Sequence, residues 1–212
     1  MSAAGPPQGA QAPSGGSAAA SAAGVGAHGP WNIVRLDAVP ATPWRNGGGV
    51  TRELLAWPGA DDWRIRMSVA DVARDGPFSR FDGVRRWFAV LEGAGVRLGL
   101  DGVTHELTQH SAPFEFDGGA QTHCELVAGR TQDFNLMLRG ARGRMVRLNG
   151  LHSLRCSAGD AVALYSGQGP ALAVFETERV DIGPQTLAWR ILEAGGAMQL
   201  EAPDALWMEI KP

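Results

Sequence analysis

Residues 96–107 read Val-Arg-Leu-Gly-Leu-Asp-Gly-Val-Thr-His-Glu-Leu, two short runs in which apolar side chains alternate with other residues. Alternation with a period of two is typical of a strand with one buried face. Only Asp101-Gly102 joins the two runs, Val96–Leu100 and Val103–Leu107. An Asp-Gly pair readily takes the positive φ angles of a two-residue hairpin turn. The stretch therefore predicts an antiparallel β-hairpin.

The same pattern extends in both directions from this hairpin. From Trp31 onward, short runs interrupted by Gly, Pro and Asp recur about every ten residues, as in a β-sandwich or barrel. The other expected strands are Ile33–Leu36, Val50–Trp57, Trp63–Val69, Val84–Leu91, Phe114–Phe116, His123–Val127, Asp133–Leu138, Met145–Leu148, Leu151–Cys156, Ala161–Ser166, Ala171–Thr177, Leu187–Leu192 and Leu206–Ile210. No long amphipathic helix is expected, and Val69–Arg74 has room for one helical turn at most. The sequence predicts an all-β protein.

The chain divides into a tail and two similar halves. Residues 1–29 are almost entirely Ala, Gly, Ser, Pro and Gln, without a charged side chain. Such a segment has too little apolar surface to offset the entropy of ordering it, so we expect a disordered tail. A short Arg- and Gly-rich link between Gly140 and Gly143 then separates an N-terminal half, 31–140, from a C-terminal half, 141–212.

Composition excludes several classes of partner. A net charge of −3 gives no basic surface for nucleic acid or anionic membrane. No uncharged apolar run approaches the ~20 residues that span a bilayer. Two cysteines, Cys124 and Cys156, fit a reduced cytoplasmic protein, although a disulfide between them stays open. We expect a cytoplasmic protein that binds neither nucleic acid nor membrane.

Patterns for metal binding and nucleophilic catalysis are missing. The five histidines form no His-x-His or His-x-x-x-His pair, the spacing that would place two metal ligands on one face; a site built from distant strands stays open. There is no Gly-x-Ser-x-Gly elbow, and the glycine runs match neither the phosphate loop nor the dinucleotide fingerprint. The prediction is no metal, no cofactor and no catalytic residue.

Residues 44–53, Trp-Arg-Asn-Gly-Gly-Gly-Val-Thr-Arg-Glu, are expected to form a loop that leads into a strand. Glycines allow another backbone or a ligand to come close. Asn46, Thr51 and Glu53 would then converge on a small molecule. The alternative is a loop whose glycines only serve a turn.

Arginines must be judged by position, because only Lys211 among the 19 basic residues is a lysine and biased codon content explains their number. In Trp63–Val69 the apolar side chains fall on one face, with Arg64, Arg66 and Ser68 on the other. Arg86 interrupts an otherwise apolar strand, where a charge is seldom buried unless it is paired or meets a ligand. A polar cup and a solvated outer face both fit Arg66 and Arg86. Asp133 and Asn135 are interpreted as edge or turn residues.

Several stretches together resemble the HutD/Ves family. They are residues 44–53, Arg66-Met67-Ser68-Val69-Ala70, Asp75-Gly76-Pro77-Phe78-Ser79, Phe81-Asp82-Gly83 with Arg86, Leu91-Glu92-Gly93, Pro113-Phe114-Glu115-Phe116-Asp117-Gly118 and Asp133-Phe134-Asn135-Leu136-Met137. They occur in the family's order and cover residues 31–139. Asp82 departs from the family pattern, which usually has proline there, and the tail is no part of that pattern.

The resemblance implies a cupin (RmlC-like) fold with two β-barrel halves, in a family linked to bacterial histidine utilisation whose members look like metal-free binding or regulatory proteins. Carried over by position, it implies a ligand site in the N-terminal half made of Trp44, Asn46, Gly48, Thr51, Glu53, Arg66, Ser68, Phe78, Ser79 and Arg86. The expected partner is a small acidic metabolite of the urocanate or formylglutamate type. Arg66 or Arg86 would clamp its carboxylate.

Two other functions stay open. A metal-independent isomerase or hydrolase would need a general acid or base, for which Glu53 is the first candidate and His105 or His123 the next. A protein-interaction module would use the tail or an exposed sheet edge. The sequence leaves the oligomeric state open, a homodimer included.

Overall fold

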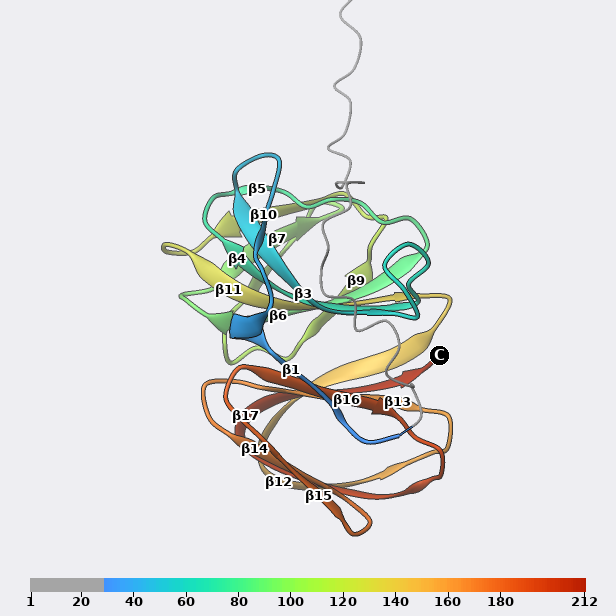
Figure 1. The fold of residues 1–212 in the computed structure, drawn as a ribbon. Helices are drawn as coiled ribbons and strands as arrows, with labels where there is room; N and C mark the ends of the chain where they lie inside the picture. The colour runs from blue at the N-terminus through green and yellow to red at the C-terminus, as the bar shows by residue number, and fades with distance from the viewer. Residues whose placement is uncertain (1–28) are drawn as a thin grey trace, which may run out of the picture.

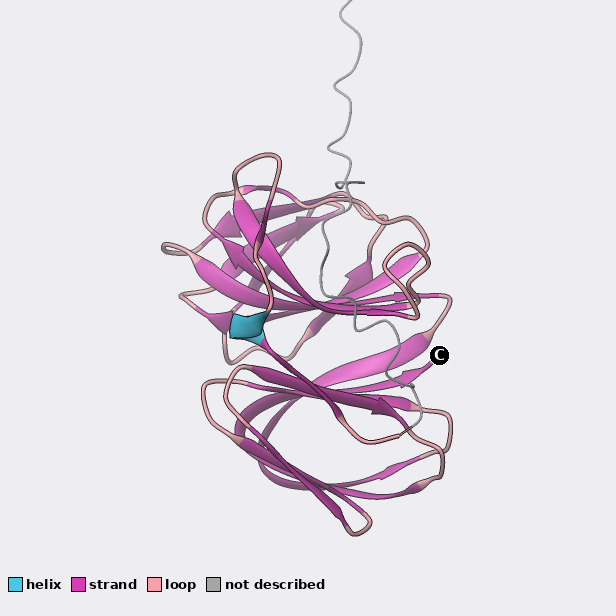
Figure 2. Ribbon diagram, viewed as in Figure 1, coloured by secondary structure: helices cyan, strands magenta, loops and turns pink. Residues whose placement is uncertain are grey.

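The computed structural model describes residues 29–212, which form two stacked β-barrel halves (Figure 1). The predicted tail therefore lies outside the described residues, except for Gly29. The N-terminal half contains β2 (Thr42–Pro43), β3 (Gly49–Trp57), β4 (Ile65–Val72), β5 (Gly76–Pro77), β6 (Val84–Glu92), β7 (Val96–Leu100), β8 (Val103–Leu107), β9 (Phe114–Asp117), β10 (Thr122–Leu126) and β11 (Thr131–Arg139). The C-terminal half contains β12 (Arg142–Cys156), β13 (Ala161–Ser166), β14 (Ala171–Phe175), β15 (Glu178–Ile182), β16 (Thr186–Ile191) and β17 (Gly196–Lys211). Between the halves lie β1 (Asn32–Arg35) and a short 3-10 helix, η1 (Leu36–Ala38), the one helix in the described part of the chain (Figure 2).

The strands pair antiparallel throughout residues 29–212. In the N-terminal half, a six-stranded sheet in the order β2-β3-β4-β11-β6-β9 faces a four-stranded sheet in the order β5-β10-β7-β8. In the C-terminal half, a seven-stranded sheet runs β1-β16-β13-β17-β14-β15, with β12 also paired to β17. The all-β prediction is confirmed. So is the hairpin, since β7 pairs with β8 through a turn in which Asp101 and Gly102 both have positive φ.

The main core lies between the two halves. Alternation turns Ile65, Met67 and Val69 of β4 toward the C-terminal half, together with Phe134 and Leu136 of β11. They pack against side chains such as Tyr165, Leu187, Trp189 and Met208. Phe134 is fully buried, with its ring centroid 4.9 Å from that of Tyr165. The opposite faces of β4 and β11 are thereby left to line the interior of the N-terminal barrel.

Three local features differ from the expectations. β1 belongs by sequence to the predicted N-terminal half, 31–140, but it pairs with β16 in the sheet of the C-terminal half, 141–212. Val69–Arg74, which had room for one helical turn at most, contains none, because β4 continues to Val72 and is paired on both sides, with β3 and β11. Trp63 precedes β4 and packs with Val84 and Met137, away from the face of Ile65.

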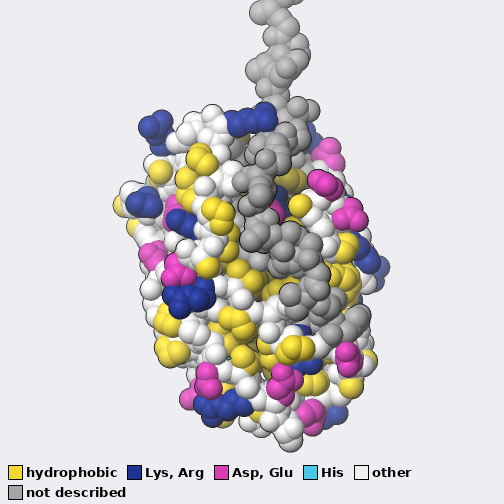
Figure 3. Space-filling view, viewed as in Figure 1, with side chains coloured by type: hydrophobic (Ala, Val, Ile, Leu, Met, Phe, Trp, Pro, Cys, Tyr) yellow, Lys and Arg dark blue, Asp and Glu magenta, His cyan; other side chains and the backbone are white. Residues whose placement is uncertain are grey.

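The surface carries mixed charges. On the face in Figure 3, Lys and Arg side chains alternate with Asp and Glu around the rim. Among residues 29–212, no helix is long and apolar enough to cross a membrane.

Candidate functional site

The three glycines of the 44–49 loop each have a separate role. Gly47 has φ +66°, a conformation that favours glycine. Gly48 donates its backbone N–H to the Asn46 side-chain oxygen at 2.9 Å, which closes the loop on itself. A Cβ on Gly49 would lie 2.3 Å from the Asp71 carbonyl oxygen, so only glycine allows β3 to approach β4 here. Asn46 and Gly48, both predicted ligand residues, therefore hold the loop together.

Trp44 of this loop packs against Phe78, which follows β5 (Gly76–Pro77). Trp44 donates its indole N–H to the Thr51 hydroxyl at 2.7 Å. Its ring packs edge-on against that of Phe78, with 6.5 Å between the ring centroids, and the Phe78 centroid lies 5.8 Å from that of Phe88 on β6. Trp44, Thr51 and Phe78 are each half-buried. These three predicted residues thus lie together, on three separate segments.

Glu53, Arg66 and Ser68 form a second group on neighbouring strands. Ser68 stands opposite Glu53 of β3 in the strand register, so the two side chains share the inner face. The Nε–H of Arg66 donates to Oε2 of Glu53 at 2.6 Å, and the two side chains are 24% and 33% exposed. Arg66, which fitted either a polar cup or a solvated outer face, therefore lies on the inner face of the N-terminal barrel with a carboxylate partner.

Arg86 is buried at 5% exposure, which excludes the solvated outer face, one of the two alternatives that fitted this residue. It donates to the Asn135 side-chain oxygen at 2.8 Å and to the Ser79 carbonyl at 3.4 Å. Three aromatic rings surround its guanidinium: Cζ lies 5.5, 5.7 and 4.9 Å from the ring centroids of Phe78, Phe81 and Phe116. Burial, and then the charge of Arg66, lower the pKa of Arg86 to about 10, so it stays charged at neutral pH. Within residues 29–212, it contacts no carboxylate and its Nε–H has no hydrogen-bond partner.

Sequence reasoning placed Asp133 and Asn135 at an edge or turn, which is wrong. β11 is a central strand, paired with β4 on one side and β6 on the other. Asn135 stands between Ser68 and Phe88 and binds Arg86. Asp133 is fully buried; it accepts a hydrogen bond from Thr131 at 2.8 Å. Burial raises the pKa of Asp133 to about 8. In the sequence, only the alternation of Asp133 and Asn135 with Phe134 and Leu136 indicated that the two polar side chains share one face of the strand.

The C-terminal barrel holds a similar but charge-balanced arrangement. Arg190 of β16 is buried between the rings of Trp31 and Phe175, at 5.8 and 5.7 Å. Unlike Arg86, it makes an ion pair with a carboxylate of its own chain, Glu178.

The strand registers extend this comparison between the halves. In the N-terminal half, Met137 stands between Arg66 and Arg86, two like charges. In the C-terminal half, Val162 stands between Arg190 and Glu209, two opposite charges. The N-terminal barrel therefore has a cation in excess on its inner face.

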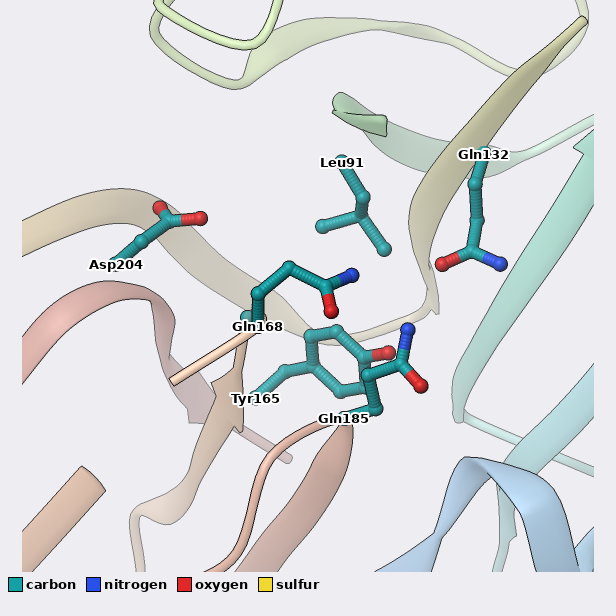
Figure 4. A pocket seen from close by; sticks show the side chains of 7 residues that line it. Leu91, Gln132, Tyr165, Gln168, Gln185 and Asp204 are labelled. Carbon is teal, nitrogen blue, oxygen red and sulfur yellow. The ribbon is translucent and has the colours of Figure 1, made fainter. Parts of the chain in front are cut away.

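Two cavities in the described part of the chain lie outside this group of residues. One, of about 10 Å³, lies between the two halves. It is lined by Leu91, Gln132, Tyr165, Gly167, Gln168, Gln185 and Asp204 (Figure 4). It is about the size of one water molecule. The other, of about 400 Å³, is an open hollow with three carboxylates, those of Asp82, Asp101 and Asp117. Neither includes a predicted site residue, and the acidic hollow does not suit an anion.

Metal ligands do not cluster in the described residues. Between residues 29 and 212, no group of three or more His, Cys, Asp or Glu side chains is placed to hold a metal ion. Cys124 and Cys156 are both free and buried, and burial raises the pKa of their thiols to about 12 and about 11. The absence of metal and cofactor remains a prediction.

The two barrel halves define the class of protein: this is a cupin fold. A cupin 2 conserved barrel domain protein from Leptotrichia buccalis has the same fold, with a TM-score of 0.53 over 85% of this chain and 95% of that one, at 9% identity.

The sequence model of the HutD family matches residues 36–211, and the chain belongs to this family. An uncharacterised 21.2 kDa protein from the hutC 3′ region of Pseudomonas putida is 38% identical over 53% of this chain, and Protein Ves of Citrobacter koseri is 41% identical over 49%. These matches span only 60% and 56% of the two relatives. The structure of HutD from Pseudomonas fluorescens SBW25 superposes with a TM-score of 0.75, at 27% identity, over 85% of this chain and 98% of that one. The predicted HutD/Ves resemblance is confirmed.

Proposed function

We propose that this protein binds a small carboxylic acid in its N-terminal barrel, with Arg86 as the residue that clamps the carboxylate. The observation that carries the proposal is the environment of Arg86. A buried cation without a counter-charge is costly, and it is retained where a ligand supplies the missing charge. A guanidinium with a free Nε–H suits a carboxylate, since it can donate two parallel hydrogen bonds.

The C-terminal barrel supports this interpretation as an internal comparison. There the buried Arg190 also lies against aromatic rings, and Glu178 of the same chain supplies the carboxylate. Among residues 29–212, no carboxylate pairs with Arg86 in this way, and we propose that an acidic ligand takes that position.

The remaining site residues suit the rest of such a ligand. Asn135 and Ser68 offer polar groups on the inner face beside Arg86. Trp44 and Phe78 are half-buried rings that would cover an apolar segment. Ser79 is exposed next to them, so a ligand would enter from this end of the barrel.

The family gives the chemical identity that we propose for the acid. The P. putida relative is described by its position in the hutC 3′ region, and a HutD structure is among the similar ones. We therefore propose an acidic intermediate of histidine degradation, urocanate or formylglutamate, and a regulatory rather than catalytic role. Glu53, the first candidate for a general acid or base, is held in an ion pair with Arg66.

Thermal unfolding of metal-stripped protein against urocanate, formylglutamate and glutamate tests the proposal. A ligand at 100 times its dissociation constant adds about 2.7 kcal/mol, which in a protein of this size raises the midpoint by roughly 5–10 °C. Arg86→Met should abolish this shift without lowering the stability of the free protein, because it removes an unpaired buried charge. Arg66→Ala should weaken binding while the protein stays folded, because it leaves the carboxylate of Glu53 without its partner beside the bound acid.

Arg190→Met is the matched control. It leaves Glu178 without its partner, so it should destabilise the protein and leave the ligand shift unchanged. A shift that survives in Arg86→Met would refute the clamp. A response to zinc or iron and to none of the acids would instead favour metal-dependent catalysis, and loss of urocanate absorbance over time would favour an enzyme.

A further inference from the structure

Glu53 is a carboxylate inside a site proposed to bind carboxylates. A register shift between Glu53 and Leu55 interrupts the pairing of β3 with β4, so Glu53 and Leu55 turn to different faces of the sheet. Glu53 shares the inner face with Ser68, while Leu55 joins the core between the halves. The carboxylate of Glu53 accepts a hydrogen bond from the Nε–H of Arg66 at 2.6 Å.

Glu53 sets the charge that the site offers to a ligand. Arg66 and Arg86 stand on either side of Met137 and are close enough for the charge of Arg66 to disfavour the charged form of Arg86. Glu53 neutralises Arg66, whereas no carboxylate in the described chain neutralises Arg86. Two arginines and one carboxylate leave a single positive charge unmatched. Asp133 does not change this near neutral pH, because its pKa is about 8.

Resting on the proposed function, we propose that Glu53 determines charge specificity. It favours acids with one negative charge and disfavours a second carboxylate at the Arg66 end of the site, so of the two acids proposed above it favours urocanate over the diacid formylglutamate. Glu53 of β3 and Arg86 of β6 lie on the same inner face of the sheet, separated by β4 and β11, so a ligand clamped by Arg86 can extend toward Glu53. A second negative charge there is repelled by Glu53, and Arg66 is already partnered. An uncharged amide at the same place meets no such repulsion.

Glu53→Gln isolates the charge from the position of this side chain. Glutamine keeps an oxygen that can accept the Arg66 Nε–H, so Arg66 stays in place while the negative charge is lost. Binding of N-formylglutamate and N-formylglutamine, which differ by one carboxylate and one amide, is measured by calorimetry on the full-length protein. Relative to the monoacid, Glu53→Gln should strengthen binding of the diacid by about tenfold or more, and added salt should shrink the effect.

Glu209→Gln is the control variant, since Glu209 stands on the inner face of the other barrel and pairs with Arg144. It should leave the ratio of the two affinities unchanged. If Glu53→Gln binds both acids but keeps the wild-type ratio, or weakens both equally, the selectivity is refuted and the clamp stands. If neither acid binds the wild-type protein or the variant, the proposed function fails and the selectivity fails with it.

Discussion

Replacing Asp133 with asparagine should remove a loss of stability that the wild-type protein undergoes between about pH 4 and pH 8. The carboxyl of Asp133 is fully buried, and within residues 29–212 only Thr131 donates a hydrogen bond to it. Burial raises its pKa from 3.8 to about 8; Thr131 opposes this change, and the negative charge of Asp71 adds to it. The folded protein therefore keeps a proton that the unfolded chain releases.

The sign and size follow from proton linkage. The contribution of Asp133 is fully present below the pKa of the unfolded chain, near 4, and is lost as pH rises to the folded value, near 8. Over this interval the free energy of unfolding falls by about 1.4 kcal/mol per pH unit, roughly 5 kcal/mol in all. The raised pKa values of Cys124 and Tyr165 lie above this interval, as does the lowered value of Arg86.

Urea denaturation of both proteins from pH 4 to pH 8 measures the effect as a difference, so every contribution common to the two proteins cancels. The free energy of unfolding of Asp133→Asn should be nearly flat where that of the wild type declines. Asp82→Asn, at a side chain 85% exposed, should keep the wild-type slope. Parallel curves for the wild type and Asp133→Asn would refute the buried neutral carboxyl.

Two further predictions concern packing. Gly49→Ala should lower the free energy of unfolding, measured by urea denaturation, by roughly 2 kcal/mol, because its Cβ would meet the Asp71 carbonyl. Gly48→Ala is the control and should cost much less, since its Cβ meets only the movable Asn46 side chain. Equal losses of stability in the two variants would contradict the close approach of β3 to β4. Tyr165→Phe should raise the free energy of unfolding by about 1 kcal/mol, since the buried hydroxyl has no hydrogen-bond partner within residues 29–212. A loss of stability in Tyr165→Phe would show instead that the hydroxyl is hydrogen-bonded in the small cavity of Figure 4.

Strand prediction succeeded where the signal was local. Val96–Leu100, Val103–Leu107 and Ala161–Ser166 were predicted to the residue, because alternation and turn chemistry lie within each stretch. Prediction was weaker at β15 (Glu178–Ile182), which was missed, and at β12 (Arg142–Cys156), which was predicted as two strands. Both strands are exposed along much of their length, so their apolar pattern is faint.

The site could be predicted only in outline. Arg86 stood out because a charge in an apolar strand needs a partner, and family resemblance supplied the neighbouring positions. Asp133 gave no such signal, since a carboxylate in a strand looks the same at an edge as in a centre. Its burial depends on β11 being paired on both sides, by β4 and β6.

By itself, the sequence determined the all-β class, the hairpin and the family, because alternation, turn residues and motif order are properties of neighbouring residues. Only the tertiary structure decided the partner of each charge. Arg86 meets Asn135, 49 positions away, while Glu53 and Arg66 meet across two strands. Those partners depend on strand order and register, which are fixed by contacts between distant segments, so the unmatched charge on Arg86 is visible only once the barrel has closed.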